Sequence, residues 1–131
     1  MSAPPAAPFA PGRWPIEAYG AGGFRFAGMS HRGSILASPA GVRALEARVA
    51  ADLDAAALAT LIEEARAAPG SVDLVLLGTG QGLVPPARAL REALRAVGVR
   101  CEPMSTAAAA RTYNVLMAED RRVAAALLAV E

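Results

Sequence analysis

The sequence predicts a layered α/β domain with a β-rich first half, and three features of its second half carry the α/β part of that prediction. An apolar run over 72–77 ends in alternating glycines, a helical pattern covers 84/85–97, and a second short apolar segment follows over 99–104. A strand, a helix and a second strand in this order form a βαβ unit, here 72–104, with parallel strands and a right-handed crossover. A chain of 131 residues fits a single domain.

The first half predicts a β-rich segment. Residues 14–29 contain a turn cluster of small residues and then Phe24-Arg25-Phe26, whose period-two alternation is typical of a half-buried strand. Residues 31–36 predict a second short strand. Residues 42–49 fit a strand or a helix, and we favour a strand at 42–45, although alanine and glutamate there argue for the helix.

Further helices complete the predicted domain. Asp54 is a candidate N-cap for a helix that ends before Pro69 and has an apolar stripe of Leu58, Leu61, Ile62 and Ala65. After the βαβ unit, Ser105 or Thr106 is expected to cap a helix that runs to about residue 118. Residues 119–130 are expected to form a closing helix or a continuation of that one.

The composition narrows the domain limits and the class of protein. Residues 1–14 are rich in proline and small residues and predict a flexible arm, with the α/β domain over 15–131. A net charge of +1 and only 5% aromatic residues disfavour nucleic-acid binding. Cys101 is the only cysteine, and the arm lacks the features of a signal peptide, so we expect a bacterial cytoplasmic protein without a membrane span.

Polar groups are expected to gather where the two predicted parallel strands end. The loop Gly78, Thr79, Gly80 and Gln81 follows one strand, and the cap Ser105 and Thr106 follows the other. Arg111 and Asn114 lie further along the second helix. Backbone N–H groups and two helix N-termini at one edge would favour a small anion. The alternative is structural: the glycines form a turn, the hydroxyls cap, and Arg111 pairs with a carboxylate.

A dinucleotide site is the tempting interpretation of this loop, and the sequence argues against it. In the pattern G-x-G-x-x-G, Leu83 stands where the third glycine belongs. Pro85 and Pro86 also remove two N–H groups from the start of the helix that would hold the pyrophosphate. No cofactor is therefore predicted.

No set of catalytic or metal-binding residues can be assembled from the sequence. His31 is the only histidine, with no acid or nucleophile at a recognisable spacing, and is expected to be structural or exposed. Cys101 is expected to be an inert core thiol. Ser34 and Ser105 lack the G-x-S-x-G context of a hydrolase.

Three blocks of sequence resemble a known family: 19–26 (YGAGGFRF), 73–80 (DLVLLGTG) and 102–116 (EPMSTAAAARTYNVL). The chain is similar to the small domain of unknown function shared by mitochondrial respiratory complex I assembly factor 3 and the adipogenesis-associated domain protein, over residues 16–130. The resemblance implies a three-layer α/β domain without an established enzymatic activity or agreed catalytic residues. Its mitochondrial relative acts in complex I assembly with a partner protein.

Two functions are therefore expected for this chain. The first is a non-catalytic accessory or assembly factor that acts through protein contacts, with respiratory-complex assembly as the role that the resemblance implies. The second is a small-molecule or anion-binding protein, or an enzyme, that uses the pocket between Gly78–Gln81 and Ser105–Asn114. There Arg111 would hold an anionic group while Thr79 or Thr106 oriented the ligand.

Overall fold

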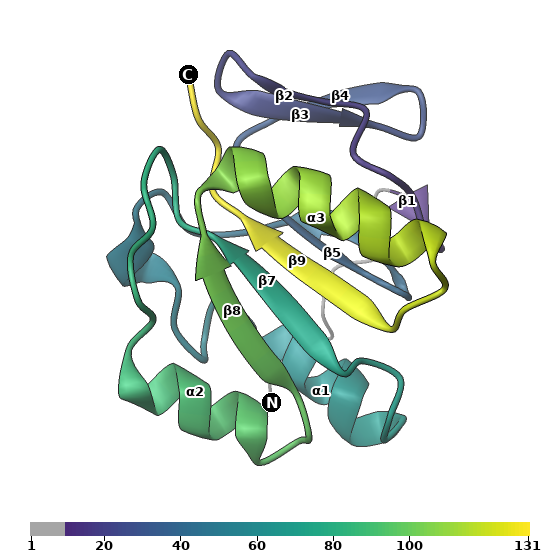
Figure 1. Ribbon diagram of the computed structural model, residues 1–131, viewed down its shortest axis with the longest axis vertical. Coiled ribbons are helices and arrows are strands. Elements are labelled where there is room, and N and C mark those ends of the chain that lie inside the picture. The colour runs from purple at the N-terminus through teal and green to yellow at the C-terminus, as the bar shows by residue number, and fades with distance from the viewer. Residues whose placement is uncertain (1–9) are drawn as a thin grey trace, which may run out of the picture.

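The computed structural model describes residues 10–131, and a mixed six-stranded sheet forms its middle layer (Figure 1). The strand order is β1-β6-β5-β9-β7-β8. The strands are β1 (Ala10–Pro11), β5 (Ile35–Ser38), β6 (Gly41–Ala44), β7 (Leu74–Gly78), β8 (Arg100–Met104) and β9 (Val123–Leu127). β7 pairs in parallel with β8 and β9, whereas β5 pairs antiparallel with β9 and β6.

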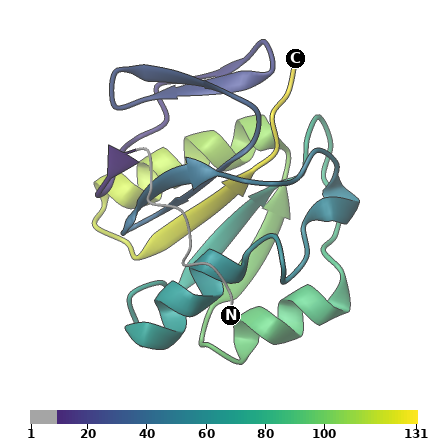
Figure 2. The same cartoon turned by 180° about the vertical axis from the view of Figure 1, so that it is seen from behind.

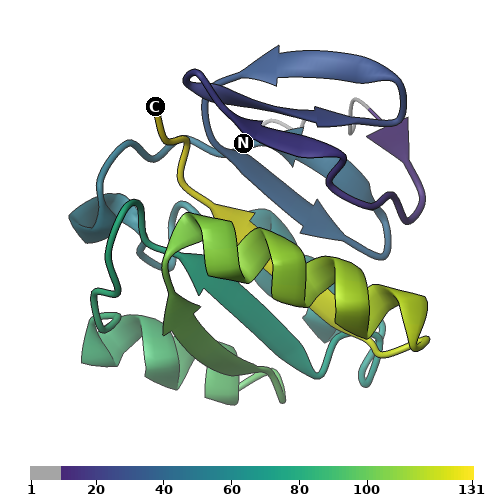
Figure 3. The same cartoon turned by 45° about the horizontal axis from the view of Figure 1, so that its top comes forward.

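Two outer layers cover this sheet, which confirms the predicted three-layer α/β architecture. One layer contains η1 (Ala50–Asp52), α1 (Ala59–Ala67) and α2 (Arg88–Arg95) (Figure 2). The other contains α3 (Thr106–Ala118) and a small antiparallel sheet (Figure 3). The small sheet has the order β2 (Ala18–Gly20), β3 (Gly23–Phe26) and β4 (Met29–Arg32).

Each face of the large sheet has its own hydrophobic core, because side chains alternate along the strands. Along β9, Ala124 and Ala126 pack in the core beneath α1 and α2. Val123, Ala125 and Leu127 pack in the core beneath α3. All residues of β9 and β7 are buried, as expected for central strands covered on both faces.

The prediction of a closing helix over residues 119–130 is wrong, because this segment contains the central strand β9. Alanine and leucine have high intrinsic helix propensity, and this misled the sequence reading. Here the alanines are fully buried between two packed layers, where small side chains allow close packing. Asp120, at a φ of 60°, forms the turn that ends α3 and redirects the chain.

The predicted βαβ unit is present as β7, α2 and β8, with parallel strands. The second helix of this region is also confirmed, since α3 begins at Thr106 and the Ser105 hydroxyl accepts a hydrogen bond from the N–H of Ala108. α2 begins at Arg88, later than the predicted 84/85. Pro85 and Pro86 keep the preceding chain extended, because a proline ring makes helical geometry unfavourable for the residue before it.

Several boundaries in the first half differ from the prediction. The single strand predicted over 31–36 is wrong, because Gly33, at a φ of 100°, and Ser34 separate β4 from β5 in a different sheet. β6 confirms the strand that we favoured at 42–45. α1 begins at Ala59, since the Asp54 carboxylate accepts from Ala57 N–H (2.8 Å) and closes a separate turn before the helix.

The predicted arm over 1–14 falls in part outside the described residues, which begin at Ala10. Ala10 and Pro11 form β1 and pair with Val42 and Gly41 of β6. Within residues 10–131, no helix is both long enough and apolar enough to cross a membrane.

Candidate functional site

Gly78 and Gly80, at the end of β7, are required for different structural reasons. A Cβ at Gly78 would lie 2.9 Å from Leu127 Cδ2 and 3.0 Å from Thr106 Cα, so a side chain does not fit beneath the start of α3. Gly80 has open space but a φ of 100°, which favours glycine. Gly78 therefore permits close packing, and Gly80 permits the turn.

The two threonines of the predicted site join the strand ends to one another. Thr79 donates its backbone N–H to Met104 O (2.9 Å), and its hydroxyl oxygen accepts from Val84 N–H (3.0 Å) and lies 2.5 Å from Gly82 O. The Thr106 hydroxyl accepts from Gly80 N–H (3.0 Å) and donates to Leu128 O (2.8 Å). Both side chains are buried and hydrogen-bonded within the chain.

Arg111 and Asn114 contact the strand segment that leads into the small sheet. The Asn114 side chain accepts from Ile16 N–H and donates to Ile16 O, both at 2.8 Å, so its amide pairs with the backbone as a neighbouring strand would. Arg111 Nη1 donates to the Tyr19 hydroxyl (3.0 Å). These residues hold α3 against the segment around β2.

The structure thus brings the predicted loop and cap together, through the contacts of Gly80 with Thr106. Gln81 is exposed beside them, and Ser105 caps α3. Arg111 and Asn114 lie on the same helix, but their side chains contact Tyr19 and Ile16. Ligand binding by these residues stays a prediction.

Sequence reasoning missed an apolar surface at the same edge. Leu83 and Val84, in the loop between β7 and α2, are 61% and 44% exposed. This loop lies beside the segment around η1 in all three overall views, and exposed Val49 immediately precedes η1 (Figures 1–3). Two adjacent apolar residues between Gly82 and a proline pair were the available signal.

Three ionisable groups have clearly shifted pKa values, and each has a local cause. Burial in the core on the α3 side of the large sheet raises the pKa of Tyr113 to about 12. Burial also raises the pKa of the Cys101 thiol, which the nearby Arg91 opposes. Hydrogen bonds from the backbone N–H groups of Arg48 and Val49 lower the pKa of Asp52. These groups lie in separate parts of the fold, and residues 10–131 contain no cluster of His, Cys, Asp and Glu suited to a metal ion.

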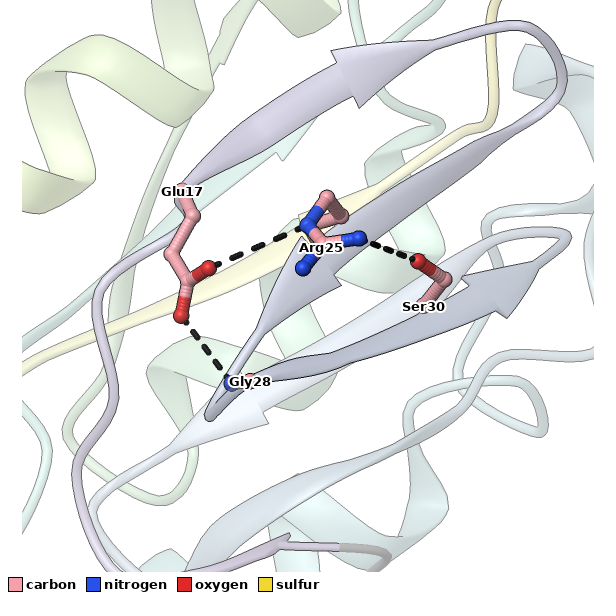
Figure 4. Close-up of polar contacts among 4 residues, drawn as sticks. All are labelled: Glu17, Arg25, Gly28 and Ser30. Carbon is pink, nitrogen blue, oxygen red and sulfur yellow. Dashed lines mark hydrogen bonds and ion pairs between the residues drawn. The ribbon is translucent and has the colours of Figure 1, made fainter.

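The small sheet carries a polar network on its outer face (Figure 4). Arg25 Nη1 donates to Ser30 Oγ (3.2 Å), and its Nε lies 4.0 Å from Glu17 Oε2. The other Glu17 oxygen accepts from Gly28 N–H (3.1 Å). His31, on β4, pairs with Phe24 of β3, and this pair is next to the pair of Arg25 and Ser30. The network stabilises the β3–β4 hairpin and leaves Arg25 engaged.

Residues 16–128 match the model of the family described as protein of unknown function (DUF498/DUF598). The chain belongs to this family. An uncharacterized protein of Rhodobacter capsulatus is 47% identical over 117 residues, which are 89% of this chain and 86% of the relative. The family resemblance inferred from sequence is thereby confirmed.

Solved structures share the complete fold. A Bartonella henselae protein described as an outer membrane protein has a TM-score of 0.87 and 44% identity, covering 93% of this chain and 99% of its own. A Rhodopseudomonas palustris protein has a TM-score of 0.78 and 42% identity, with 99% and 93% covered. A Mth938-like domain of Bordetella pertussis has a TM-score of 0.75 and 30% identity, with 98% and 90% covered. These relatives are bacterial, consistent with a bacterial member.

Proposed function

We propose that the protein is a non-catalytic accessory or assembly factor that acts through protein contacts. One observation carries the proposal. At the edge where the sequence predicted a ligand site, Thr79, Thr106 and Asn114 form hydrogen bonds within the chain, while Leu83 and Val84 remain exposed. Exposed apolar side chains beside a satisfied polar framework favour a protein partner.

The loop that carries Leu83 and Val84 is held in place. Thr79 binds Val84 N–H and the Gly82 carbonyl, so the apolar side chains project from an anchored turn. A preorganised loop loses less conformational entropy when a partner binds, which favours recognition by a small surface. Leu83 and Val84 are the residues that we expect to contact the partner.

The family resemblance supports a narrower role. We infer a cytoplasmic bacterial protein that helps to assemble a respiratory complex. The role of a relative with a similar fold supports this assignment, independently of the exposed Leu83 and Val84.

Crosslinking in cells followed by affinity purification tests the proposal. Leu83→Ser combined with Val84→Ser is expected to abolish recovery of the partner. Val115→Ser is the matched control, because Val115 is 57% exposed on α3. Equal recovery with all three proteins, or no partner with wild type, would contradict the proposal. Recovery of a respiratory-complex subunit would support the narrower role.

The second candidate is anion binding by the predicted loop and cap. The positive end of α3, which begins directly after Ser105, favours it. Arg111→Ala is expected to reduce the thermal stabilisation that a bound anion provides. An equal response of wild type and Arg111→Ala to every anion would exclude this candidate.

A further inference from the structure

A groove of about 430 Å³ lies between α2 and the free edge of β8, at the opposite end of β8 from the site described above. The groove is lined by Arg91, Arg95, Gly98, Val99, Arg100, Cys101 and Glu102. Figure 1 shows this region at the turn that joins α2 to β8. The arginines are exposed, so their substitution leaves the cores intact.

The charges around the groove are unbalanced. Arg91 and Arg95 are one helical turn apart on α2, where like charges repel each other. Glu92, the acid on the same helix, pairs with Arg88 (3.0 Å). Within residues 10–131, neither Arg91 nor Arg95 forms an ion pair. Repulsion between two arginines that form no ion pair favours an anionic ligand.

The backbone supplies a donor at the same place. Arg100 donates its N–H to Asp73 O (3.0 Å), and Met104 O accepts from Thr79 N–H (2.9 Å), so alternate residues of β8 face β7. The N–H of Cys101 therefore points to the free edge. Pro103, next in the same alternation, has no N–H to offer. A single backbone donor beside two guanidinium groups fits a compact oxyanion better than an added β-strand.

The floor of the groove is neutral. Cys101 packs partly against the core beneath α2, and burial raises the pKa of its thiol. A protonated thiol does not repel an anion. The groove lining contains one carboxylate, Glu102, and three arginines, so its charge is positive overall.

We propose that Arg91, Arg95 and the Cys101 N–H bind a phosphoryl group. Arginine guanidinium groups suit phosphate because their N–H donors match its oxygens. The cavity of about 560 Å³ at the small sheet is less suitable, because Arg25, one of its two lining arginines, is engaged by Glu17 and Ser30 (Figure 4).

Titration at constant ionic strength, followed by amide NMR, tests the site with inorganic phosphate and phenyl phosphate. The Cys101 amide resonance is expected to shift saturably. Arg91→Gln with Arg95→Gln is expected to weaken binding by about tenfold or more, from the loss of charge-assisted hydrogen bonds. Arg88→Gln, on the same helix but outside the groove lining, is expected to bind like wild type.

Binding to vesicles that contain phosphatidic acid distinguishes a lipid headgroup from a soluble phosphate ester as the source of the phosphoryl group. Vesicle binding that depends on Arg91 and Arg95 and exceeds phenyl phosphate binding would support a lipid headgroup. The reverse order would support a soluble phosphate ester. An unmoved Cys101 amide, or equal losses from Arg88→Gln and the double variant, would overturn the proposal.

Discussion

At the scale of single residues, Gly78 and Asn114 show how side-chain fit explains a sequence motif. Both were expected to contribute to a ligand site. Gly78 lies beneath the start of α3. The Asn114 side chain forms the two backbone hydrogen bonds with Ile16 that a neighbouring strand would otherwise form. Their residue types follow from packing and hydrogen bonding within the chain, whatever the same edge binds.

Gly78→Ala is expected to destabilise the fold by about 1–3 kcal/mol, because the new methyl group would overlap Thr106 and Leu127. Chemical denaturation measures this loss. Gly82→Ala is the control, since a Cβ there meets no atom within 4 Å and should change stability by less than about 0.5 kcal/mol. Equal effects of the two substitutions would contradict the packing explanation.

The raised pKa of Tyr113 leads us to expect a loss of folding stability at alkaline pH. Burial raises its pKa from 10.0 to about 12, so the folded state retains a proton that the unfolded state releases. The contribution is fully present below pH 10 and is lost as pH rises towards 12, amounting to roughly 3 kcal/mol. Denaturation measured across this range checks the slope. Tyr113→Phe should remove this part of the pH dependence, and an unchanged slope would count against it.

At the scale of elements, β8 is an edge strand whose free side is poor in donors. Pro103 lies where an outward N–H would otherwise be available, and proline is a common protection of exposed sheet edges. This limits pairing of β8 with another chain. The sequence shows the proline, but the register of β8 against β7 decides that the missing N–H is on the free edge.

Pro103→Thr is expected to promote self-association through β8, because it restores an edge donor and raises β propensity. Analytical ultracentrifugation over a concentration series measures the change. Glu102→Thr is the control, since the N–H of residue 102 faces β7. Association of both variants to the same extent would indicate a surface effect rather than edge pairing.

The elements differ in how well local sequence predicted them. α3 was recognised because Ser105 caps it and its helical pattern is uninterrupted. β9 was missed because Ala124, Ala125 and Ala126 favour a helix when taken alone. Burial between two layers overrides that preference, and local sequence does not report burial on both faces.

At the scale of the whole molecule, β9 joins the two halves of the domain. It pairs antiparallel with β5 from the first half and in parallel with β7 from the second. The last strand in the chain thus completes the sheet, and both cores include its side chains. We expect the domain to fold as one cooperative unit.

Ala125→Asp tests this cooperativity. An unpaired carboxylate at this fully buried position is expected to cost several kcal/mol, a large part of a typical domain's stability. Trp14 fluorescence and far-UV circular dichroism should report a single, lowered transition. Ala118→Asp, at an exposed position on α3, should have little effect. Separate transitions for the two probes would show that the halves fold independently.

The sequence by itself determined the α/β class, the βαβ unit, the capped helix α3, the family and the meeting of the 78–81 loop with residues 105–106. These depend on local periodicity, caps and the common direction of parallel strands. Only the tertiary structure decided that residues 123–127 form the central strand, that Asn114 binds the Ile16 backbone, and that Arg91 and Arg95 flank an open sheet edge. These depend on burial and on contacts between segments distant in the chain, which no local pattern records.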